Sequence, residues 1–231
     1  MNKKIAFFLP VRRGSERVRD KNTRPFAGNE DGLLGNKIAQ LVGCHRIDEI
    51  IVSTNDPDCI GVAMKFSDAR IRVDRRPERL CTSETNLQDL IAYVPSVSEA
   101  DVLVWGHVTT PFADAECYDY AVDQYLAALD KGFDSLIGVR EVHNFFLDKT
   151  GRIINNSSPL AWPRTQDLDP LYEVNHTVFI AGREIYEKKR NRTGDHPYLH
   201  TMSPLESFDI DWEDDFAMAE MMANGIRNLG G

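Results

Sequence analysis

The 231-residue sequence lacks the cysteine patterns of metal-binding and disulfide-stabilised proteins. Its four cysteines are Cys44, Cys59, Cys81 and Cys117, and no two of them form a CxxC pair. None has a histidine at the spacing of a metal site. We therefore predict reduced, mostly buried thiols in a protein of the cytosol.

The sequence also lacks long apolar runs. No stretch approaches the roughly 20 apolar residues that a membrane span requires. The N-terminus has two lysines and then only five apolar residues before Pro10, which is too short for the apolar region of a signal peptide. We expect a soluble, cytoplasmic protein with no membrane partner.

An excess of positive charge is absent as well. The chain has 36 acidic and 27 basic residues and a formal net charge of -9, whereas proteins that bind nucleic acid usually have a basic balance. We therefore expect no nucleic-acid partner. Hydrophobic residues make up 42% of the chain, enough for a sizeable core. The length is typical of one α/β domain or of one domain with an insertion, and we predict a single domain over 1–231.

Positive charge is nevertheless concentrated directly after the first apolar run, in the segment "PVRRGSERVRDKN" (10–22). Gly14 allows the backbone to approach a ligand closely, and Ser15 and the nearby amides can donate hydrogen bonds to phosphate oxygens. The cations of the segment are Arg12, Arg13, Arg17, Arg19 and Lys21, and guanidinium groups match phosphate geometry. The alternative is a solvated charged loop. The segment has neither the GK[ST] ending of a P-loop nor the glycines of GxGxxG, so a nicotinamide-dependent oxidoreductase is only weakly indicated.

Short apolar runs alternate with stretches of helical periodicity. The predicted strands are 4–9, 48–54, 100–108 and 134–141, and the predicted helices are 33–44, 58–67, 83–94 and 115–132. Ser83, followed by Asn86 in place of the Glu or Gln of a full capping box, is the predicted cap of the third helix. This alternation favours an α/β fold with a mainly parallel sheet and helices on both faces. Ligands bind beyond the carboxyl ends of such strands, so the loops 10–22, 53–57 and 107–112 should converge on one edge.

The alternation of apolar runs and helical stretches ends at about residue 142. Prolines at 159, 163 and 170 and few helix signals indicate an extended insertion with short β elements over about 142–172. A strand is expected over 174–182. The segment "SFDID" (207–211) reads as a short strand that leads into an amphipathic helix with an acidic first turn, which suits the helix dipole.

Two aspartates of that last strand form a candidate metal site. Asp209 and Asp211 should share one face of an extended segment, and paired carboxylates suit Mg²⁺. Asp214 and Asp215 fall at the start of the helix and are assigned to capping. The alternative is an ordinary polar edge before a helix. A cationic loop for a polyphosphate together with carboxylates for its metal suits nucleotidyl transfer.

These segments resemble the cytidylyltransferases that activate sugar acids, the family of CMP-N-acetylneuraminate synthetase. "LPVRRGSERVRDKNTRPFAG" is similar to the signature RxGSKxxxxKNxxxxxG, and "ESFDIDWEDDFAMAE" to xxxDIDTEEDFxxAE. Weaker similarities lie between them, in order along the chain. They are "DEIIVSTNDPDCIGVA", "RRPERLCTSETNLQDLI", "VLVWGHVTTPF" and "LYEVNHTVFI".

The resemblance implies a nucleotidyltransferase-type α/β fold and a homodimer in which the insertion reaches the partner subunit. It implies transfer of CMP from CTP to the anomeric hydroxyl of a 2-keto-3-deoxy sugar acid, with Mg²⁺ and release of pyrophosphate. The product would be a CMP-activated sugar acid for a surface glycan.

The resemblance also assigns residues. Those on the nucleotide side are Arg12, Gly14, Ser15, Lys21, Asn22, Arg76 and Thr85. Asp209 and Asp211 match the metal-binding aspartates, and His107, Arg164 and Asn175 match positions that face the sugar acid. Arg12, Lys21 and Asp211 are the predicted catalytic residues. An arginine such as Arg164 would suit a substrate carboxylate.

Three positions depart from the family pattern. Glu16 replaces a lysine, and a carboxylate beside a triphosphate is unfavourable unless it turns away or pairs with Arg13, Arg17 or Arg19. His107 replaces a glutamine and is either a hydrogen-bonding residue or a general base. His176 replaces a glycine and should reshape the pocket. These changes leave open another nucleotide such as GTP, a phosphonate acceptor, or a non-catalytic nucleotide-binding protein.

The remaining histidines and two of the tryptophans carry no signal for function. We expect Trp105 and Trp212 in the core. His45, His143, His196 and His200 are expected on the surface or at helix ends.

Overall fold

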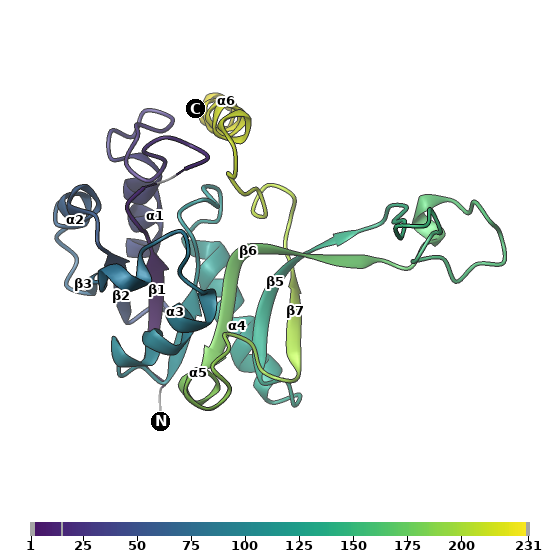
Figure 1. Ribbon diagram of the computed structural model, residues 1–231, viewed down its shortest axis with the longest axis horizontal. Helices are drawn as coiled ribbons and strands as arrows, with labels where there is room; N and C mark the ends of the chain where they lie inside the picture. The colour runs from purple at the N-terminus through teal and green to yellow at the C-terminus, as the bar shows by residue number, and fades with distance from the viewer. Residues whose placement is uncertain (1–2, 15, 230–231) are drawn as a thin grey trace.

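The computed structural model describes residues 3–14 and 16–229, and within them seven strands form one sheet in the order β3-β2-β1-β4-β6-β5-β7 (Figure 1). The strands are β1 (Ile5–Pro10), β2 (Glu49–Thr54), β3 (Ile71–Arg75), β4 (Val102–Trp105), β5 (Ser135–Val142), β6 (Leu171–Gly182) and β7 (Pro197–Thr201). Four neighbouring pairs are parallel, while β6 runs antiparallel to both β4 and β5. The predicted mainly parallel α/β sheet is confirmed, with one reversed strand.

Helices cover both faces of the sheet, as predicted. They are α1 (Gly32–Val42), α2 (Pro57–Ala63), α3 (Leu87–Tyr93), α4 (Ala115–Leu129), α5 (Arg183–Lys189) and α6 (Glu213–Leu229). Figure 1 shows α3 and α5 in front of the sheet and α1 and α4 behind it. Among the residues described, no helix has both the length and the apolar character to cross a membrane.

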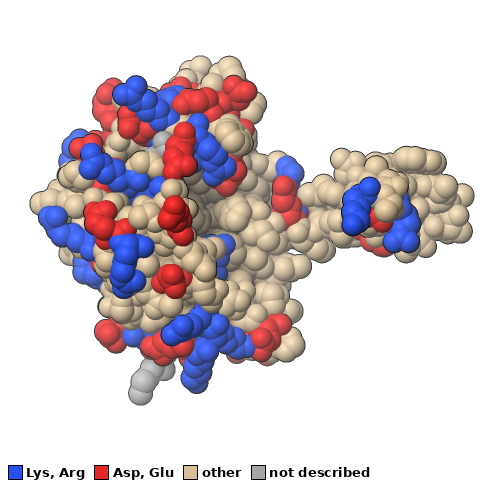
Figure 2. Space-filling model, viewed as in Figure 1, with Lys and Arg blue, Asp and Glu red and all other residues tan. Residues whose placement is uncertain are grey.

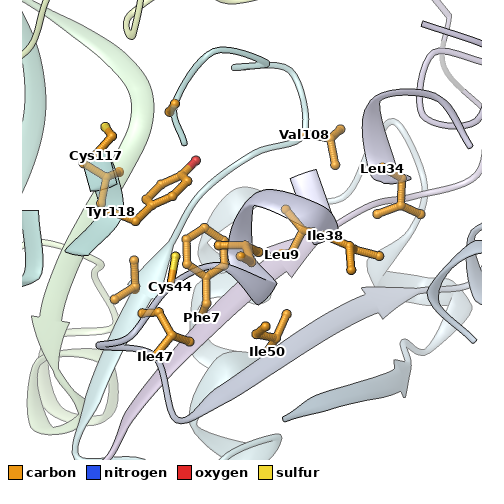
Figure 3. Close-up of a cluster of buried hydrophobic side chains, with 14 of the residues drawn as sticks. Phe7, Leu9, Leu34, Ile38, Cys44, Ile47, Ile50, Val108, Cys117 and Tyr118 are labelled. Carbon is orange, nitrogen blue, oxygen red and sulfur yellow. The ribbon is translucent and has the colours of Figure 1, made fainter. Parts of the chain in front are cut away.

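The fully apolar β1 explains why the sheet can be covered on both sides. Its side chains alternate in direction, so Phe7 joins one buried cluster and Phe8 the other. Figure 3 shows Phe7 beside Tyr118 of α4, with their ring centroids 5.0 Å apart in an edge-to-face arrangement. Phe8 packs on Trp105 on the opposite face. The four cysteines are buried and free, as predicted.

Several sequence-based predictions about elements are wrong. The third helix starts at Leu87 rather than near 83, because Asn86 is the residue whose side chain caps it, accepting from the Gln88 amide. Residues 208–211 form no strand. The segment 207–211 crosses the end of β4 instead, where the Ile210 amide donates to the Thr109 carbonyl at 2.9 Å.

Other elements were not predicted at all. β3 and β7 are edge strands with mixed polar and apolar residues, and α5 is a short helix after β6. Two side chains were also misplaced. Trp212 is 60% exposed because it precedes the first turn of α6, and His200 is buried within β7.

The predicted insertion is an arm. The last residues of β5 and the first of β6 pair from Val139↔Val174 to Val142↔Leu171. This two-stranded ribbon carries 143–170 away from the body of the molecule (Figure 1). A chain that leaves and returns through adjacent strands must pair them antiparallel, which accounts for the reversed direction of β6.

One buried cation fixes the loop after β4 against α1. Lys37 has no exposed surface, and its Nζ donates to the carbonyls of Thr110 and Ala113, both at 2.9 Å, and to the Tyr118 hydroxyl at 2.8 Å. Burial lowers the pKa of Lys37 to about 7. The three acceptors match the three donors of the ammonium group, so Lys37 holds the loop that carries His107.

We expect Lys37→Met to lower the free energy of unfolding by about 3 kcal/mol, because it leaves buried acceptors without a donor. Urea unfolding followed by circular dichroism would measure the loss. Lys131→Met, at an exposed position after α4, is the matched control and should change stability by less than about 0.5 kcal/mol. Equal stabilities of the two variants would contradict the role given to Lys37.

Candidate active site

The N-terminal loop and the acidic segment before α6 meet at the carboxyl ends of the strands. Lys21 Nζ donates to the Ile210 carbonyl at 2.8 Å. Because Ile210 stands between Asp209 and Asp211 in the sequence, this bond brings the ammonium group to the backbone of the acidic segment. The Arg13 amide donates to Asn55 Oδ1 after β2 at 3.0 Å. The predicted convergence of loops 10–22, 53–57 and 107–112 is therefore confirmed.

Opposite charges meet where the N-terminal loop contacts the acidic segment before α6. Burial lowers the pKa of Lys21, and the carboxylates of Asp209 and Asp211 counteract that effect. Burial also raises the pKa of Asp209, and the neighbouring Asp211 adds to the rise. Oδ1 of Asp209 is buried without a hydrogen-bond partner among the described residues. A buried oxygen of this kind is costly unless a donor or a cation reaches it.

Asp211 has a different environment. Arg17 Nη2 lies 2.8 Å from Asp211 Oδ1, and the Arg17 guanidinium stands 5.4 Å from the ring centroid of Trp212. Both side chains of the ion pair are about half exposed. Arg17 therefore engages one carboxylate oxygen of Asp211.

The first turn of α6 holds the backbone of Asp211 and contacts the N-terminal loop. Asp215 Oδ2 accepts from the amides of Asp211 at 3.0 Å and Trp212 at 2.8 Å, so its predicted capping role is confirmed. Glu213 accepts from the Arg19 amide at 3.2 Å and forms an ion pair with Arg24 at 2.8 Å. Asp214 is exposed.

Asp209 and Asp211 line one cavity of about 350 Å³. Within the described part of the chain, no group of three or more His, Cys, Asp or Glu side chains could enclose a metal ion. Two carboxylates are nevertheless the protein contribution that Mg²⁺ often takes when substrate phosphates and waters complete its shell. The two aspartates, one with an unpartnered oxygen, fit such an ion.

The N-terminal loop borders two further cavities. One of about 600 Å³ and one of about 330 Å³ are both lined by Arg12, Gly14, Lys21 and Asn22. Gly14 has a φ of +77°, which favours glycine, and its carbonyl accepts from Arg12 Nη1 at 3.1 Å. Asn22 Nδ2 donates to the Arg12 carbonyl at 3.1 Å. Ser15 lies outside the described residues.

Glu16 borders the smaller cavity of the N-terminal loop. It lines the cavity of about 330 Å³ together with Arg12 and Lys21. Its carboxylate is largely exposed, and Arg12 Nη2 lies 3.9 Å from its Oε1. Of the expected partners Arg13, Arg17 and Arg19, none forms an ion pair with Glu16 among the described residues.

Two nucleotide-side residues lie further along the same edge. The Arg76 amide donates to the Thr54 carbonyl at 3.0 Å, which places Arg76 just past the ends of β2 and β3. Its side chain is 4% exposed, and Nε donates to Cys81 Sγ at 3.1 Å. Thr85 is partly buried, and its hydroxyl donates to the Arg79 carbonyl at 3.2 Å. Their role toward a nucleotide stays a prediction.

His107 is a hydrogen-bonding residue. The Trp105 indole donates from Nε1 to His107 Nε2 at 3.1 Å, which leaves the proton of the neutral ring on Nδ1. Burial, together with nearby Arg192 and His176, lowers the pKa of His107 to about 3. Of the two predicted roles, general base is contradicted because the lone pair of Nε2 is already engaged.

The other acceptor-side residues are separated. Asn175 is buried, and its Nδ2 donates to Ser207 Oγ at 2.9 Å beside the carboxylate cavity. Arg164 lies on the arm and is paired with Asp167 at 2.8 Å. The structure does not bring Arg164 together with the other predicted residues of its own chain. Its role stays a prediction.

Of two residues near His107, the sequence indicated His176 only as a change in the shape of the pocket, and it did not indicate Arg192. His176 has a φ of +58°, and its ring centroid is 6.2 Å from that of His107. Arg192 lies over the rings of Phe179 and Trp105. The substitution of a histidine for the family's glycine pointed to position 176. No motif or periodicity marks Arg192.

A mixed α/β sheet with a cationic loop after its first strand, facing a carboxylate pair, is the arrangement of a nucleotidyltransferase. The chain belongs to the cytidylyltransferase family, because the sequence profile of that family matches residues 6–226.

Relatives of known activity are similar over most of this chain. N-acylneuraminate cytidylyltransferase of Streptococcus agalactiae serotype III is 24% identical over 216 residues, covering 90% of this chain and 50% of the relative. CMP-N,N'-diacetyllegionaminic acid synthase of Legionella pneumophila is 26% identical over 232 residues, covering 95% and 96%. The chain thus spans about half the length of the streptococcal relative and nearly all of the Legionella one.

Solved structures share the fold. A CMP:2-keto-3-deoxy-manno-octonic acid synthetase complexed with CTP has a TM-score of 0.67 and 11% identity, covering 96% of this chain and 99% of that one. The 4-diphosphocytidyl-2C-methyl-D-erythritol synthase of Anaerococcus prevotii has a TM-score of 0.69 and 13% identity, covering 99% and 100%. At these identities the likeness establishes the fold alone.

We expect the imidazole of His107 to stay neutral from pH 8 down to pH 5, because its pKa is lowered to about 3. The ¹⁵N chemical shifts of the ring, assigned with the His107→Gln variant, would report an unprotonated Nε2 and a protonated Nδ1 throughout. A titration of this ring between pH 5 and 8 would contradict the arrangement and restore the general-base interpretation.

Proposed function

We propose that the protein transfers CMP from CTP to the anomeric hydroxyl of a 2-keto-3-deoxy sugar acid and releases pyrophosphate. The observation that carries the proposal is the contact of Lys21 with the Ile210 carbonyl. This contact joins a cationic loop, of the kind that binds phosphates, to a pair of carboxylates. The chain in which it occurs is a member of the cytidylyltransferase family. Relatives named for N-acylneuraminate and N,N'-diacetyllegionaminic acid support a sugar acid as acceptor.

The loop after β1 holds the nucleotide in this proposal. Arg12 and Lys21 neutralise the triphosphate, the backbone around Gly14 approaches it, and Asn22 contacts the nucleoside side. Arg76 and Thr85 lie toward the base, past β2 and β3. Fixed cations in a partly enclosed site stabilise the charge that shifts toward the departing pyrophosphate.

Asp209 and Asp211 would hold Mg²⁺, with Oδ1 of Asp209 the buried and unpartnered ligand. When bound, the ion offsets negative charge on the phosphates. Arg17 pairs with Oδ1 of Asp211, and a bound triphosphate would offer Arg17 an alternative anion. The acceptor hydroxyl attacks the α-phosphorus and loses its proton to solvent, and the bond from that phosphorus to the β-phosphate oxygen breaks, so that pyrophosphate leaves.

Turnover measured with CTP tests the proposal. We expect purified protein with Mg²⁺, CTP and a suitable sugar acid to release pyrophosphate, and EDTA to abolish the release. The panel is N-acetylneuraminic, legionaminic, pseudaminic and 2-keto-3-deoxy-manno-octonic acids. Asp211→Asn should lower kcat by about 10²-fold or more, whereas Asp214→Asn, at the exposed position of the same segment, should retain activity.

The other outcomes of this experiment have defined meanings. Release with GTP, or with a phosphonate in place of the sugar acid, would keep the chemistry and change a substrate. CTP binding in a thermal-shift assay without release from any acceptor would favour a non-catalytic nucleotide-binding role. Absence of CTP binding would reject the proposed function. The buried free thiols are consistent with a reducing compartment such as the cytoplasm.

We also propose that the arm forms a homodimer. Figure 2 shows that charged side chains crowd the body on the visible face, whereas the arm is mostly uncharged. Leu160 and Trp162 of the arm are 63% and 72% exposed. Exposed apolar residues concentrated on one extended segment are typical of a protein interface.

Sedimentation equilibrium should therefore give a mass near twice 26.2 kDa. The double change Leu160→Ala and Trp162→Ala should shift the protein toward monomer, because it removes large apolar contacts. Met221→Ala, an exposed apolar residue on α6, serves as the control and should leave the dimer intact. A monomeric wild-type protein at micromolar concentration would contradict the dimer.

A further inference from the structure

Arg192 is a partly buried cation without an acidic partner. It lies between α5 and β7, and its guanidinium carbon is 3.7 Å from the ring centroid of Phe179 and 5.3 Å from that of Trp105. No Asp or Glu of the described residues is within ion-pair distance, and burial lowers the pKa of Arg192. By contrast, Arg70 and Arg183, whose side chains are about one quarter exposed, each have an acidic partner.

A desolvated guanidinium without an anion is unfavourable, and the cation–π contacts compensate only in part. Aromatic rings offer no lone-pair acceptor, and the N–H groups of Arg192 have no hydrogen-bond acceptor among the described residues, so these donors remain for a ligand. Arginine donors form a planar fork that matches a carboxylate. A ligand that suits Arg192 is therefore an anion with two coplanar oxygens, such as a carboxylate.

His107 adds a second donor beside the same indole. Trp105 engages Nε2 of His107 at 3.1 Å, so the hydrogen on Nδ1 is available. Arg192 and Lys21 are among the neighbours that lower the pKa of His107. Cations beside an N–H donor attract an anion.

The position of these groups matches that of an acceptor. His107 lines the cavity that contains Arg12 and Lys21, and His176, whose ring stands against that of His107, lines the cavity of Asp209 and Asp211. The two histidines therefore border the phosphate loop and the carboxylate pair, and Arg192 adjoins them through Trp105, whose ring centroid is 5.3 Å from its guanidinium carbon.

A bulge in β6 produces this arrangement. Ile137 pairs with Phe179 and Val139 with Val174, so residues 175–178 stand opposite the single residue Gly138. A side chain at Gly138 would meet Asn175 Oδ1 at 2.8 Å. The bulge holds His176 in the left-handed region, at φ +58°. Bulges and strained non-glycine residues of this kind concentrate at functional sites.

We propose that Arg192 and His107 form the subsite that binds the carboxylate of the acceptor, an inference that rests on the proposed cytidylyl transfer. The Arg192 guanidinium takes both carboxylate oxygens, and the N–H at Nδ1 of His107 supports one of them. The subsite belongs to the body of a single chain, unlike Arg164 on the arm. It selects acceptors that carry a carboxylate next to the reacting carbon.

The test compares an acid with its neutral ester in two variants. N-acetylneuraminic acid, N,N'-diacetyllegionaminic acid and their methyl esters are the probes, and pyrophosphate release gives KM and kcat. Arg192→Met keeps the apolar contact with Phe179 and removes the charge. Arg190→Met, an exposed arginine two residues away on the same loop, is the matched control.

We expect Arg192→Met to raise KM for the acid by about 10- to 100-fold, the range of a hydrogen bond to a charged group. KM for CTP and for the ester should change less than about twofold, so the preference for acid over ester falls by the same factor. Arg192→Lys should recover part of the affinity, because it keeps charge without the planar fork. Arg190→Met should behave as wild type.

The outcomes separate this inference from the proposed function. If wild type turns over an acid and Arg192→Met keeps the same acid-to-ester ratio, the subsite alone is refuted. If Arg192→Met does not fold, Arg192→Lys decides, and an unchanged KM for the acid overturns the proposal. If wild type binds CTP but calorimetry detects no binding of either acid, the acceptor assignment and the subsite fall together. If CTP does not bind, the proposed function itself fails.

Discussion

The contact between Lys21 and the Ile210 carbonyl is the interaction on which the site depends. It spans 189 positions of the chain and brings a cationic loop against an acidic segment. Without the acids, burial would make the ammonium group unfavourable, and without Lys21, Asp209 and Asp211 would repel each other. Each half of the site thus stabilises the other.

The loop network around that contact explains how flexible side chains can be held precisely. Lys37, Thr110 and Tyr118 fix the loop after β4, and that loop in turn receives the Ile210 amide through Thr109. A buried network with every donor matched to an acceptor rigidifies its surroundings. The loop after β4 therefore connects the core behind the sheet to the catalytic edge.

The reversed strand β6 shapes the other half of the site. Because the chain leaves along β5 and returns along β6, the arm and the acceptor side are parts of one ribbon. The bulge at 175–178 places His176 in the lining of the carboxylate cavity. Phe179, which follows the bulge, packs against the Arg192 guanidinium. An interface formed by the arm would therefore be connected through β5 and β6 to the pocket that we assign to the acceptor.

The sequence by itself determined the fold class, the order of the main elements and the two charged segments of the site. Apolar runs such as "IAFFL" can only be buried on both faces of a sheet, and the motifs around Arg12 and Asp211 are local and contiguous. The edge strands β3 and β7 escaped prediction because half-buried strands carry mixed residues. The exposure of Trp212, the engaged Nε2 of His107 and the position of Arg192 were decided by tertiary structure alone. Each depends on neighbours that are remote in sequence or on a loop without periodicity. The burial and hydrogen-bond partners that set the chemistry of these groups exist only once the sheet has assembled.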